Sequence, residues 1–515
     1  MVVTPMLQPH LQKYLPKRLY ARIDLAIYGW EFRRKDEVHG RLGKTFALVT
    51  LDECTLVADP ALASAILQRR KDFHQPAVVE KVMGIFGSNI VTVSLVAFPR
   101  DFILGADAKR KWKLVQRCDM ATPAQNDRTE FQRKYLANGV ERDLSASAGN
   151  AILHAATSWK PNSERAATAD PRSFAQTIDE GKNAYFETIL LVAEMLLEAA
   201  LIPAAVLKLW FMPARLQLLG RRKEKMPAYT RAVLDMERRA AGEEPTSHRS
   251  FLKMLVGCAE EAKGASASDL FLTDDEISGN LFIFSVAGFE TTANTMGYAV
   301  MLLAVYPKWQ TWMREDIQHL PLDPSVWKYD EVFPKSTRIL AVMFETLRLF
   351  TAVMHATRSV AEPQQVAGAA STSPHLLLPP MDIFISMQII HADRDLWGPD
   401  CADFKPSRWI DGTGQLVTPP KGTFMPWSGG PRVCPGMKMA QVEFVAALAV
   451  LFRSVRCDPV PLGGEDLDAA RRRLRGLMRD PVAQVSLQIR DPNAVVLRWS
   501  EIGRGSGEGR PDAQG

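Results

Sequence analysis

The chain has 515 residues, of which 47% are hydrophobic and 23% are charged, a composition that predicts a sizeable buried core and excludes a disordered or fibrous chain. Its net charge is only +5 at pH 7 and no basic stripe is interleaved with aromatic residues, which argues against nucleic-acid binding. The six cysteines include no Cys-x-x-Cys pair, which argues against a disulfide framework and a structural zinc site and favours a reducing compartment.

The start of the chain contains no apolar run long enough to cross a bilayer, so we treat residues 1–40 as an N-terminal segment without a clear membrane anchor. The most apolar window is internal, at 189–212, and two glutamates, Pro203 and Lys208 interrupt it. This window favours a buried helix pair, or a segment resting on a membrane surface, over a membrane span.

Hydrophobic periodicity predicts several elements in the first half of the chain. They are a strand at 46–49, a strand leading into a helix over 56–69, and helices over 139–159, 173–212 and 251–262, the second of these broken at Pro203 and Pro213. Residues 93–120 fit neither a helical nor a strand period.

A capping box at Thr273–Glu276 predicts the start of a long, mostly apolar helix that runs to about Val305 and crosses the protein interior. Two more helices are predicted at 307–318 and 335–350.

Short strands separated by Gly, Pro and Ser follow Arg358. They are predicted at 360–366, 375–378 and 383–387, with a terminal hairpin over Ser486–Leu497. The Gly-rich, polar tail 503–515 is expected to be disordered. No linker divides the chain, so residues 41–502 are expected to form one domain.

A single cysteine, Cys434, lies in a loop of small and rigid residues at 426–436. Glycines allow such a backbone to bend tightly and to approach a flat ligand closely. A helix predicted over Met437–Phe452 would place Cys434 just ahead of a helix N-terminus, where amide donors and the macrodipole stabilise a metal-binding thiolate. The alternative is a buried structural cysteine in a Gly-Pro turn.

The loop resembles the haem-binding signature of the cytochrome P450 superfamily, with a tryptophan where the family more often has phenylalanine. The matching positions are Trp427, Gly430, Arg432, Cys434 and Gly436. The resemblance implies haem b as cofactor and Cys434 as the axial thiolate ligand of its iron.

The long helix contains Ala287-Gly288-Phe289-Glu290-Thr291-Thr292, whose small residues leave room beside a large planar ligand. A threonine hydroxyl one turn after Ala287 can bend the helix locally. The segment resembles the oxygen-activation motif of the same superfamily, which implies that Glu290 and Thr291 deliver protons during the activation of dioxygen. The alternative is a threonine-bearing core helix.

Other matches imply supporting roles. Glu345 and Arg348 match the Glu-x-x-Arg helix motif, and Arg408 matches the arginine that completes its buried network, so these three are read as structural support. Arg358 and Arg432 would hold the haem propionates.

Ala287 and three further residues, Ser285, Val353 and Met354, would shape the substrate pocket. His391 and His355 are read as polar residues rather than as iron ligands.

One family feature is displaced. The expected Trp-x-x-x-Arg pair is absent, since Trp112 is followed by Gln116 and then Arg117. Residues 93–117 are therefore either a real insertion near the substrate entrance or the product of a gene-model error.

The resemblance covers about residues 40–500. Within the superfamily, the chain resembles filamentous-fungal members that are active in secondary metabolism. The resemblance implies a single triangular domain, mainly α-helical with a small β-rich region, that inserts one oxygen atom from O2 into an apolar terpenoid, polyketide or alkaloid substrate. The implied electron donor is NADPH–cytochrome P450 reductase, with cytochrome b5 as a second candidate, and the implied setting is a monomer peripheral to the cytoplasmic side of the endoplasmic reticulum. The alternatives are a haem-thiolate isomerase or dehydratase and a haem-binding relative without catalysis.

Overall fold

The structure is a computed structural model, and it describes most of the chain outside two long segments and several short ones. The described residues are 8–27, 29–34, 36–49, 53–89, 91, 180–243, 274–321, 326–367, 374–483 and 486–502. The helices predicted over 139–159 and 251–262, Thr273, residues 93–117 and the tail 503–515 lie outside them.

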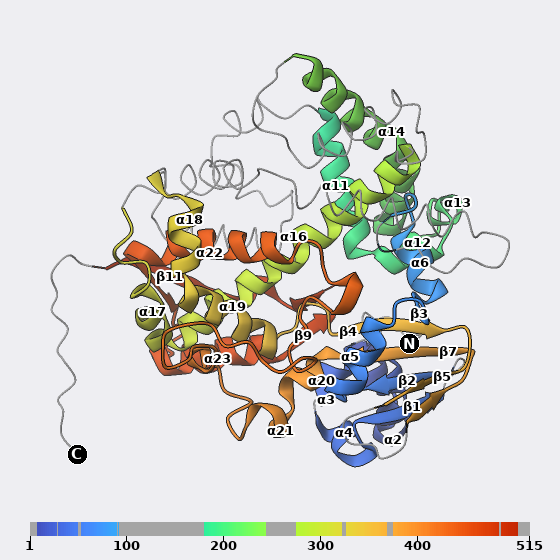
Figure 1. Ribbon diagram of the computed structural model, residues 1–515. Coiled ribbons are helices and arrows are strands. Elements are labelled where there is room, and N and C mark those ends of the chain that lie inside the picture. Colours follow the sequence, from blue (N-terminus) through green and yellow to red (C-terminus); the bar gives the residue numbers. More distant parts are fainter. Residues whose placement is uncertain are drawn as a thin grey trace, which may run out of the picture.

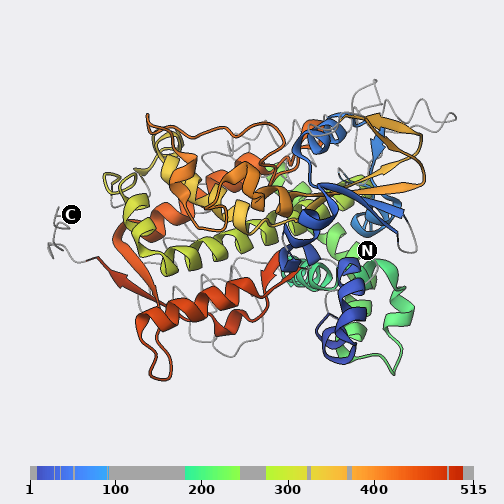
Figure 2. The same ribbon diagram turned by 90° about the horizontal axis from the view of Figure 1, so that it is seen from below.

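A five-stranded sheet forms one end of the molecule, to the right in both ribbon views (Figure 1, Figure 2). Its strand order is β1 (Thr45–Val49), β2 (Glu53–Val57), β7 (Met381–Ser386), β4 (His355–Val360) and β3 (Phe73–His74). Only the β2–β7 pair is parallel, and it aligns Leu56 with Phe384. Strands from the N-terminal region and from the C-terminal half therefore share one sheet, which holds these two parts of the chain together.

Three two-stranded sheets complete the β structure of the described residues, and they contradict one prediction. They are β5 (Gln364–Val366) with β6 (His375–Leu377), β9 (Pro481–Ala483) with β10 (Leu487–Ile489), and β8 (Val455–Pro459) with β11 (Leu497–Glu501). The hairpin predicted over Ser486–Leu497 is wrong, because β10 and β11 pair with different partners. A 3-10 turn at Pro492–Ala494 separates them, and proline there has no N–H with which to extend a ladder.

α-Helices make up most of the remaining regular structure of the described chain. The N-terminal group comprises α1 (Gln8–Tyr14), α2 (Lys17–Ile23), α3 (Trp30–Arg34), α4 (Asp36–Leu42), α5 (Pro60–Gln68) and α6 (Ala77–Met83). The middle group comprises α11 (Glu180–Glu194), α12 (Leu196–Leu201), α13 (Ala204–Leu207), α14 (Ala214–Glu243), α16 (Asp274–Val305), α17 (Pro307–Arg314), α18 (Tyr329–Val332) and α19 (Thr337–Leu349). The last group comprises α20 (Met387–Ala392), α21 (Arg394–Trp397), α22 (Met437–Ser454) and α23 (Leu467–Arg479).

The long helix α16 crosses the molecule as predicted (Figure 1). Its C-terminal half is buried with α17, α19 and α22 in the largest apolar cluster, where Met301, Val342, Leu448 and Phe452 are at most marginally accessible. Because α22 begins three residues after Cys434, this cluster also holds the cysteine loop in place.

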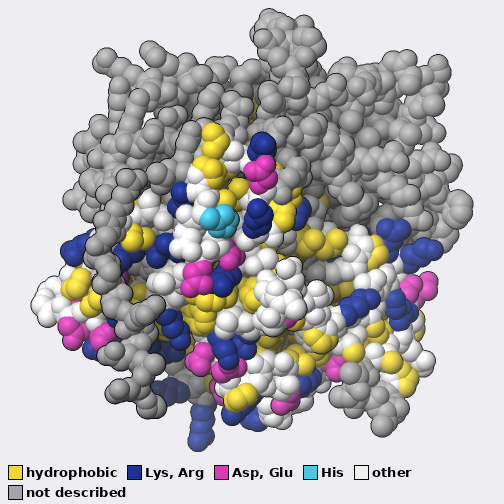
Figure 3. Space-filling model, turned by 60° about the vertical axis from the view of Figure 1, so that its left-hand side comes forward, with side chains coloured by type: hydrophobic (Ala, Val, Ile, Leu, Met, Phe, Trp, Pro, Cys, Tyr) yellow, Lys and Arg dark blue, Asp and Glu magenta, His cyan; other side chains and the backbone are white. Residues whose placement is uncertain are grey.

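The apolar window 189–212 forms the end of α11 and the two short helices α12 and α13, so the predicted break at Pro203 is confirmed. Packing of these helices on α14 and α16 buries Val192, Ala199 and Leu207. No helix among the described residues is long and apolar enough to cross a membrane. On the face shown in Figure 3, basic side chains are interspersed with acidic and apolar ones rather than gathered in a stripe.

Candidate active site

The cysteine loop is closed by its own backbone. The Ser428 amide donates to the Met425 carbonyl at 2.9 Å, and the Cys434 amide donates to the Trp427 carbonyl at 2.9 Å. Between these bonds the chain takes left-handed conformations at Ser428, φ 63°, and at Gly430, φ 68°. Cys434 itself is exposed, so the loop presents its thiol to an open space rather than to the core. The alternative of a buried structural cysteine is wrong.

Gly430 serves a purpose different from the one predicted. A Cβ atom at Gly430 would lie 2.2 Å from the carbonyl oxygen of Leu67 in α5. The close approach that glycine allows here is therefore to the protein's own backbone, and it presses the loop onto α5. Gly436 is the glycine beside the sulfur, since a Cβ there would lie 3.9 Å from Cys434 Sγ.

Replacing Gly430 by alanine should therefore destabilise the loop. The new methyl group would clash with a backbone oxygen, and the alanine would have to adopt a left-handed conformation. We expect the strain to cost about 1–3 kcal/mol of stability. We expect a lower thermal midpoint and a lower yield of haem-loaded protein. Gly412→Ala is the matched control, because no described atom lies within 4 Å of its Cβ position; equal effects of the two changes would contradict this account of the loop.

Aromatic side chains outside the loop fix its position by packing against Trp427. The Trp427 ring packs edge-on against Phe344 of α19 and Phe424, with centroids 5.9 and 6.4 Å apart. Trp427 therefore ties the loop to α19, the helix that carries Glu345 and Arg348.

Two guanidinium groups, one buried and one half-buried, lie near each other at this site. Arg358 of β4 is only 4% exposed, and burial followed by repulsion from Arg432 lowers the pKa of Arg358 to about 10. Within the described chain, its guanidinium donates only to the carbonyl of its neighbour Thr357, at 2.7 Å. Burial also lowers the pKa of Arg432, against the opposing influence of Glu80. Two cations that repel each other in a largely enclosed place fit a ligand carrying carboxylates, as the two propionates of haem would.

His74 of β3 was not singled out in the sequence, although it belongs to the same group. Burial and then the positive charge of Arg432 lower its pKa, and its Nδ1 is buried without a hydrogen bond to the described residues. A histidine ahead of Gln-Pro carries no pattern of its own, so only the fold could place it here.

The centre of α16 is open between two buried stretches of the helix. Ala287 and Gly288 are exposed, between Val286 at 3% and Thr292 at 6%, and no atom of the described residues lies within 4 Å of a Cβ built on Gly288. The Thr291 hydroxyl donates to the Ala287 carbonyl at 2.7 Å. The small residues thus leave space in mid-helix, which suits a large planar ligand.

Glu290 points away from Thr291 and toward the β9–β10 hairpin. Its Oε1 accepts hydrogen bonds from the Ser486 hydroxyl at 2.9 Å and from the Gln488 side chain. Burial raises the pKa of Glu290 although these donors oppose the shift. The structure does not bring the acid and the alcohol of the motif together in a direct hydrogen bond.

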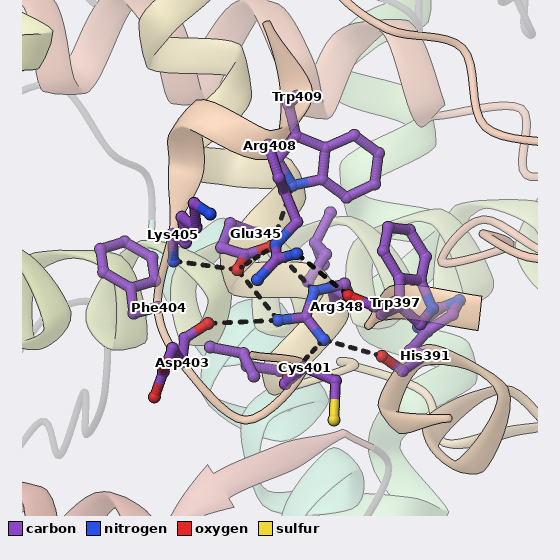
Figure 4. A network of polar contacts seen from close by, with 12 residues as sticks. Glu345, Arg348, His391, Trp397, Cys401, Asp403, Phe404, Lys405, Arg408 and Trp409 are labelled. Carbon is purple, nitrogen blue, oxygen red and sulfur yellow. Dashed lines mark hydrogen bonds and ion pairs between the residues drawn. The ribbon is translucent and has the colours of Figure 1, made fainter. Parts of the chain in front are cut away.

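The structure builds the predicted support network (Figure 4). Glu345 and Arg348 are both fully buried, and their two bonds measure 2.8 and 2.9 Å. Arg408 joins at 3.0 Å from Nε to Glu345 Oε1. The remaining Arg348 donors reach the carbonyls of His391, Cys401 and Asp403 at 2.9, 2.7 and 3.3 Å.

Two further donors to Glu345 were missed. The Trp409 indole donates to Oε2 and the Lys405 amide donates to Oε1, both at 3.0 Å. Trp409 follows Arg408 directly, and a buried indole needs an acceptor, so its position could have suggested this role. With five donors, every lone-pair direction of the Glu345 carboxylate faces a partner.

His391 is a hydrogen-bonding residue as predicted, but it lies at the end of helix α20 rather than in a loop. Its Nε2 accepts from the Met425 amide at 2.9 Å, and its Nδ1 lies 2.9 Å from the Thr351 hydroxyl. Since Thr351 donates to Leu347, Nδ1 must carry the proton. Burial, and then Arg348, lower the pKa of His391 to about 3, so the ring is neutral and anchors the start of the cysteine loop.

Acid should therefore weaken this anchor. Below pH 6.5 the His391 ring is protonated in the unfolded chain but stays neutral in the folded protein, so the unfolded chain binds more protons. The contribution of His391 to the free energy of unfolding is therefore complete above pH 6.5 and declines as the pH falls toward 3. The free-energy difference between wild type and His391→Gln should shrink by up to about 1.4 kcal/mol per pH unit in that window. Urea unfolding at several pH values measures it, and a constant difference would contradict the assignment.

The predicted pocket residues lie in different surroundings. Ser285 is partly buried and donates to the Leu281 carbonyl at 2.7 Å. Val353 is partly buried, whereas Met354 is 1% exposed and packs within the core beside Gly29. His355 pairs with the fully buried Glu31 of α3 at 3.3 Å. That pairing agrees with a polar rather than an iron-ligating role, and the N-terminal glutamate could not have been found from sequence.

Comparison with known proteins accords with this geometry. A model of the cytochrome P450 family matches residues 174–482. The phomenoic acid biosynthesis cluster cytochrome P450 monooxygenase of Leptosphaeria maculans is 29% identical over 90% of this chain and 85% of its own length. Cytochrome P450 monooxygenase prx9 of Penicillium rubens and cytochrome P450 monooxygenase ORF6 of Penicillium roqueforti are each 25% identical over 91% of this chain and 84% of their own lengths.

The mainly helical fold and the cysteine loop define a haem-thiolate oxidoreductase. The chain belongs to the cytochrome P450 family, and it is a monooxygenase.

Proposed function

We propose that this monooxygenase inserts one oxygen atom into an apolar polyketide, terpenoid or alkaloid skeleton as a tailoring step in fungal secondary metabolism. The observation that carries the chemistry is the exposed Cys434, held in a closed loop with the guanidinium groups of Arg432 and the buried Arg358 beside it. The pathway class is supported by the L. maculans relative, which belongs to a biosynthesis cluster.

The bound group is haem b in this proposal. When bound it supplies the redox chemistry that activates dioxygen. Cys434 would ligate its iron, Arg358 and Arg432 would bind its carboxylates with His74 beside them, and the open centre of α16 at Ala287 and Gly288 would leave room for its face. Gly436 keeps the space next to the sulfur clear.

The remaining residues supply order and protons. Thr291 and Glu290 lie on the open segment of α16, where a hydroxyl and a buried carboxyl with a raised pKa can hold and pass protons. Ser285, Ala287, Val353 and Met354 would set the shape of the substrate site.

The electrons would come from NADPH through cytochrome P450 reductase, with cytochrome b5 as a second donor to a monomeric enzyme. The reduced, CO-bound spectrum tests the thiolate ligand, and NADPH consumption with a panel of apolar substrates tests turnover. A spectrum without the thiolate-type band would overturn the proposal.

An apolar surface on α12, α13 and the turn before α14 supports peripheral contact with the endoplasmic reticulum membrane. Its most exposed members are Leu201 at 51%, Trp210 at 88% and Phe211 at 60%. Exposed aromatic side chains of this kind insert at a bilayer interface.

Replacing Trp210 and Phe211 by serine should therefore move the protein from the membrane pellet toward the supernatant. Each buried aromatic side chain contributes about 1.5–3 kcal/mol to such binding, so partition onto liposomes should weaken at least tenfold. The same change at Leu376 and Leu378, which are similarly exposed beside β6, should have little effect. Equal partition of the two variants would contradict this surface as the contact.

A further inference from the structure

The β9–β10 hairpin connects two parts of the active site. On one side, the Leu487 amide donates to the carbonyl of Ala352 at 2.8 Å, and Ala352 directly precedes the predicted substrate residues Val353 and Met354. On the other side, Ser486 and Gln488 donate to Glu290 of α16. One short element is thus bonded both to the expected substrate wall and to the expected proton donor.

The contacts around Ser486 have a definite direction. Asn294, one turn beyond Glu290 on α16, donates to the Ser486 hydroxyl at 2.8 Å, and that hydroxyl donates in turn to Glu290 Oε1. Ser486 is 1% exposed and Asn294 is 6% exposed. A hydroxyl that both accepts and donates in a buried place has a fixed orientation, so the hairpin holds the carboxyl group of Glu290 in one position.

The groups around Glu290 have opposing effects on its ionised form. The donors from the hairpin, including the Ser486 backbone, are neutral, and they favour the ionised carboxylate against the opposing effect of burial. From α11, the negative charge of Glu194 acts in the other direction, although Glu194 is ion-paired with Arg215 of α14. The hairpin donors are therefore the main stabilising partners of the ionised form.

We propose that Ser486 and Gln488 are positioning residues that hold Glu290 turned away from Thr291 and set the pH at which it gives up its proton. Because the same hairpin is bonded to Ala352, movement of the substrate wall would shift these donors and so couple substrate contact to proton supply. This inference rests on the proposed role of Glu290 in proton delivery.

The first test measures the position and titration of Glu290 without turnover. In the haem-loaded enzyme at rest, the infrared band of the protonated Glu290 carboxyl, identified by its absence in Glu290→Gln, is followed against pH. Gln488→Leu and Ser486→Ala each remove a donor to the carboxylate, so the titration should move to higher pH. Ser486→Thr keeps the hydroxyl and should restore the wild-type midpoint, and Gln365→Leu on β5 is the control at an exposed glutamine. Should Gln488→Leu titrate as wild type does, the inference is overturned.

The second test concerns proton delivery. Dioxygen takes two electrons and two protons to give hydrogen peroxide, or four of each to give two waters, so poor proton delivery favours peroxide. With NADPH, reductase and no added substrate, Gln488→Leu should raise the ratio of peroxide to water by about tenfold, the lower end of the effects on activity that outer-shell partners have, and shift its pH profile upward. An unchanged profile in Gln488→Leu, in an enzyme where Glu290→Gln does change it, also overturns the inference. An unchanged profile in Glu290→Gln would instead overturn the proposed role of Glu290, and the infrared titration would then decide the positioning alone.

Discussion

Cys434→Ser should abolish the thiolate-type spectrum and turnover together. A serine hydroxyl stays protonated where a cysteine at this position becomes a thiolate, so it cannot give the iron the same anionic sulfur ligand. The loss should exceed the roughly 10–100-fold effect typical of outer-shell partners. The reduced, CO-bound spectrum of purified protein and NADPH-dependent turnover measure it.

Cys401→Ser is the matched control for this change. Cys401 is half-buried, and it contributes its carbonyl rather than its thiol to the Arg348 network. It should keep both the spectrum and the turnover of the wild type. If Cys434→Ser behaved like Cys401→Ser, the assignment of the axial ligand would be wrong.

Glu345→Gln is the second change with a large expected effect. It replaces a carboxylate that accepts five hydrogen bonds, three of them from the side chains of Arg348 and Arg408. The Arg348 guanidinium is fully buried, and removing one partner of a buried ion pair leaves the other charge uncompensated, at a cost of about 3–5 kcal/mol. A typical protein has about 5–15 kcal/mol of stability in total, so we expect a much lower urea midpoint and little haem-loaded protein.

Glu315→Gln separates this effect from the loss of any charged pair. Glu315 also pairs with an arginine, Arg338, but its side chain is 52% exposed, and such surface pairs contribute about 0–1 kcal/mol. We expect its urea midpoint to stay close to that of the wild type. Similar losses in the two variants would show that burial is not the cause.

Local sequence patterns predicted two of the long helices well and the pairing of the strands poorly. The helix α16 and the helix α22 have long apolar runs and clear starts, so their extents could be predicted to within about two residues. The amphipathic helix α23 was missed because five arginines hide its apolar residues, and only Ala470, Leu474 and Met478 are buried. The pairing of β10 and β11 was also wrong, since strand alternation does not identify which strand lies alongside.

The sequence by itself determined the class of the protein. The residues of each motif lie close together in the sequence: Cys434 with its loop neighbours, Glu290 with Thr291, and Glu345 with Arg348. Each motif lies within one loop or one helix, so its residues stay close together whatever the rest of the fold is. Comparison with known proteins agrees with that class.

Only the tertiary structure decided which groups act on these residues. It brought Trp409 to Glu345, Arg432 to Arg358 and the hairpin to Glu290, contacts that join positions far apart in the chain. The physical reason is that burial, hydrogen-bond direction and the repulsion of like charges depend on distances in space, and a linear order of residues does not specify them.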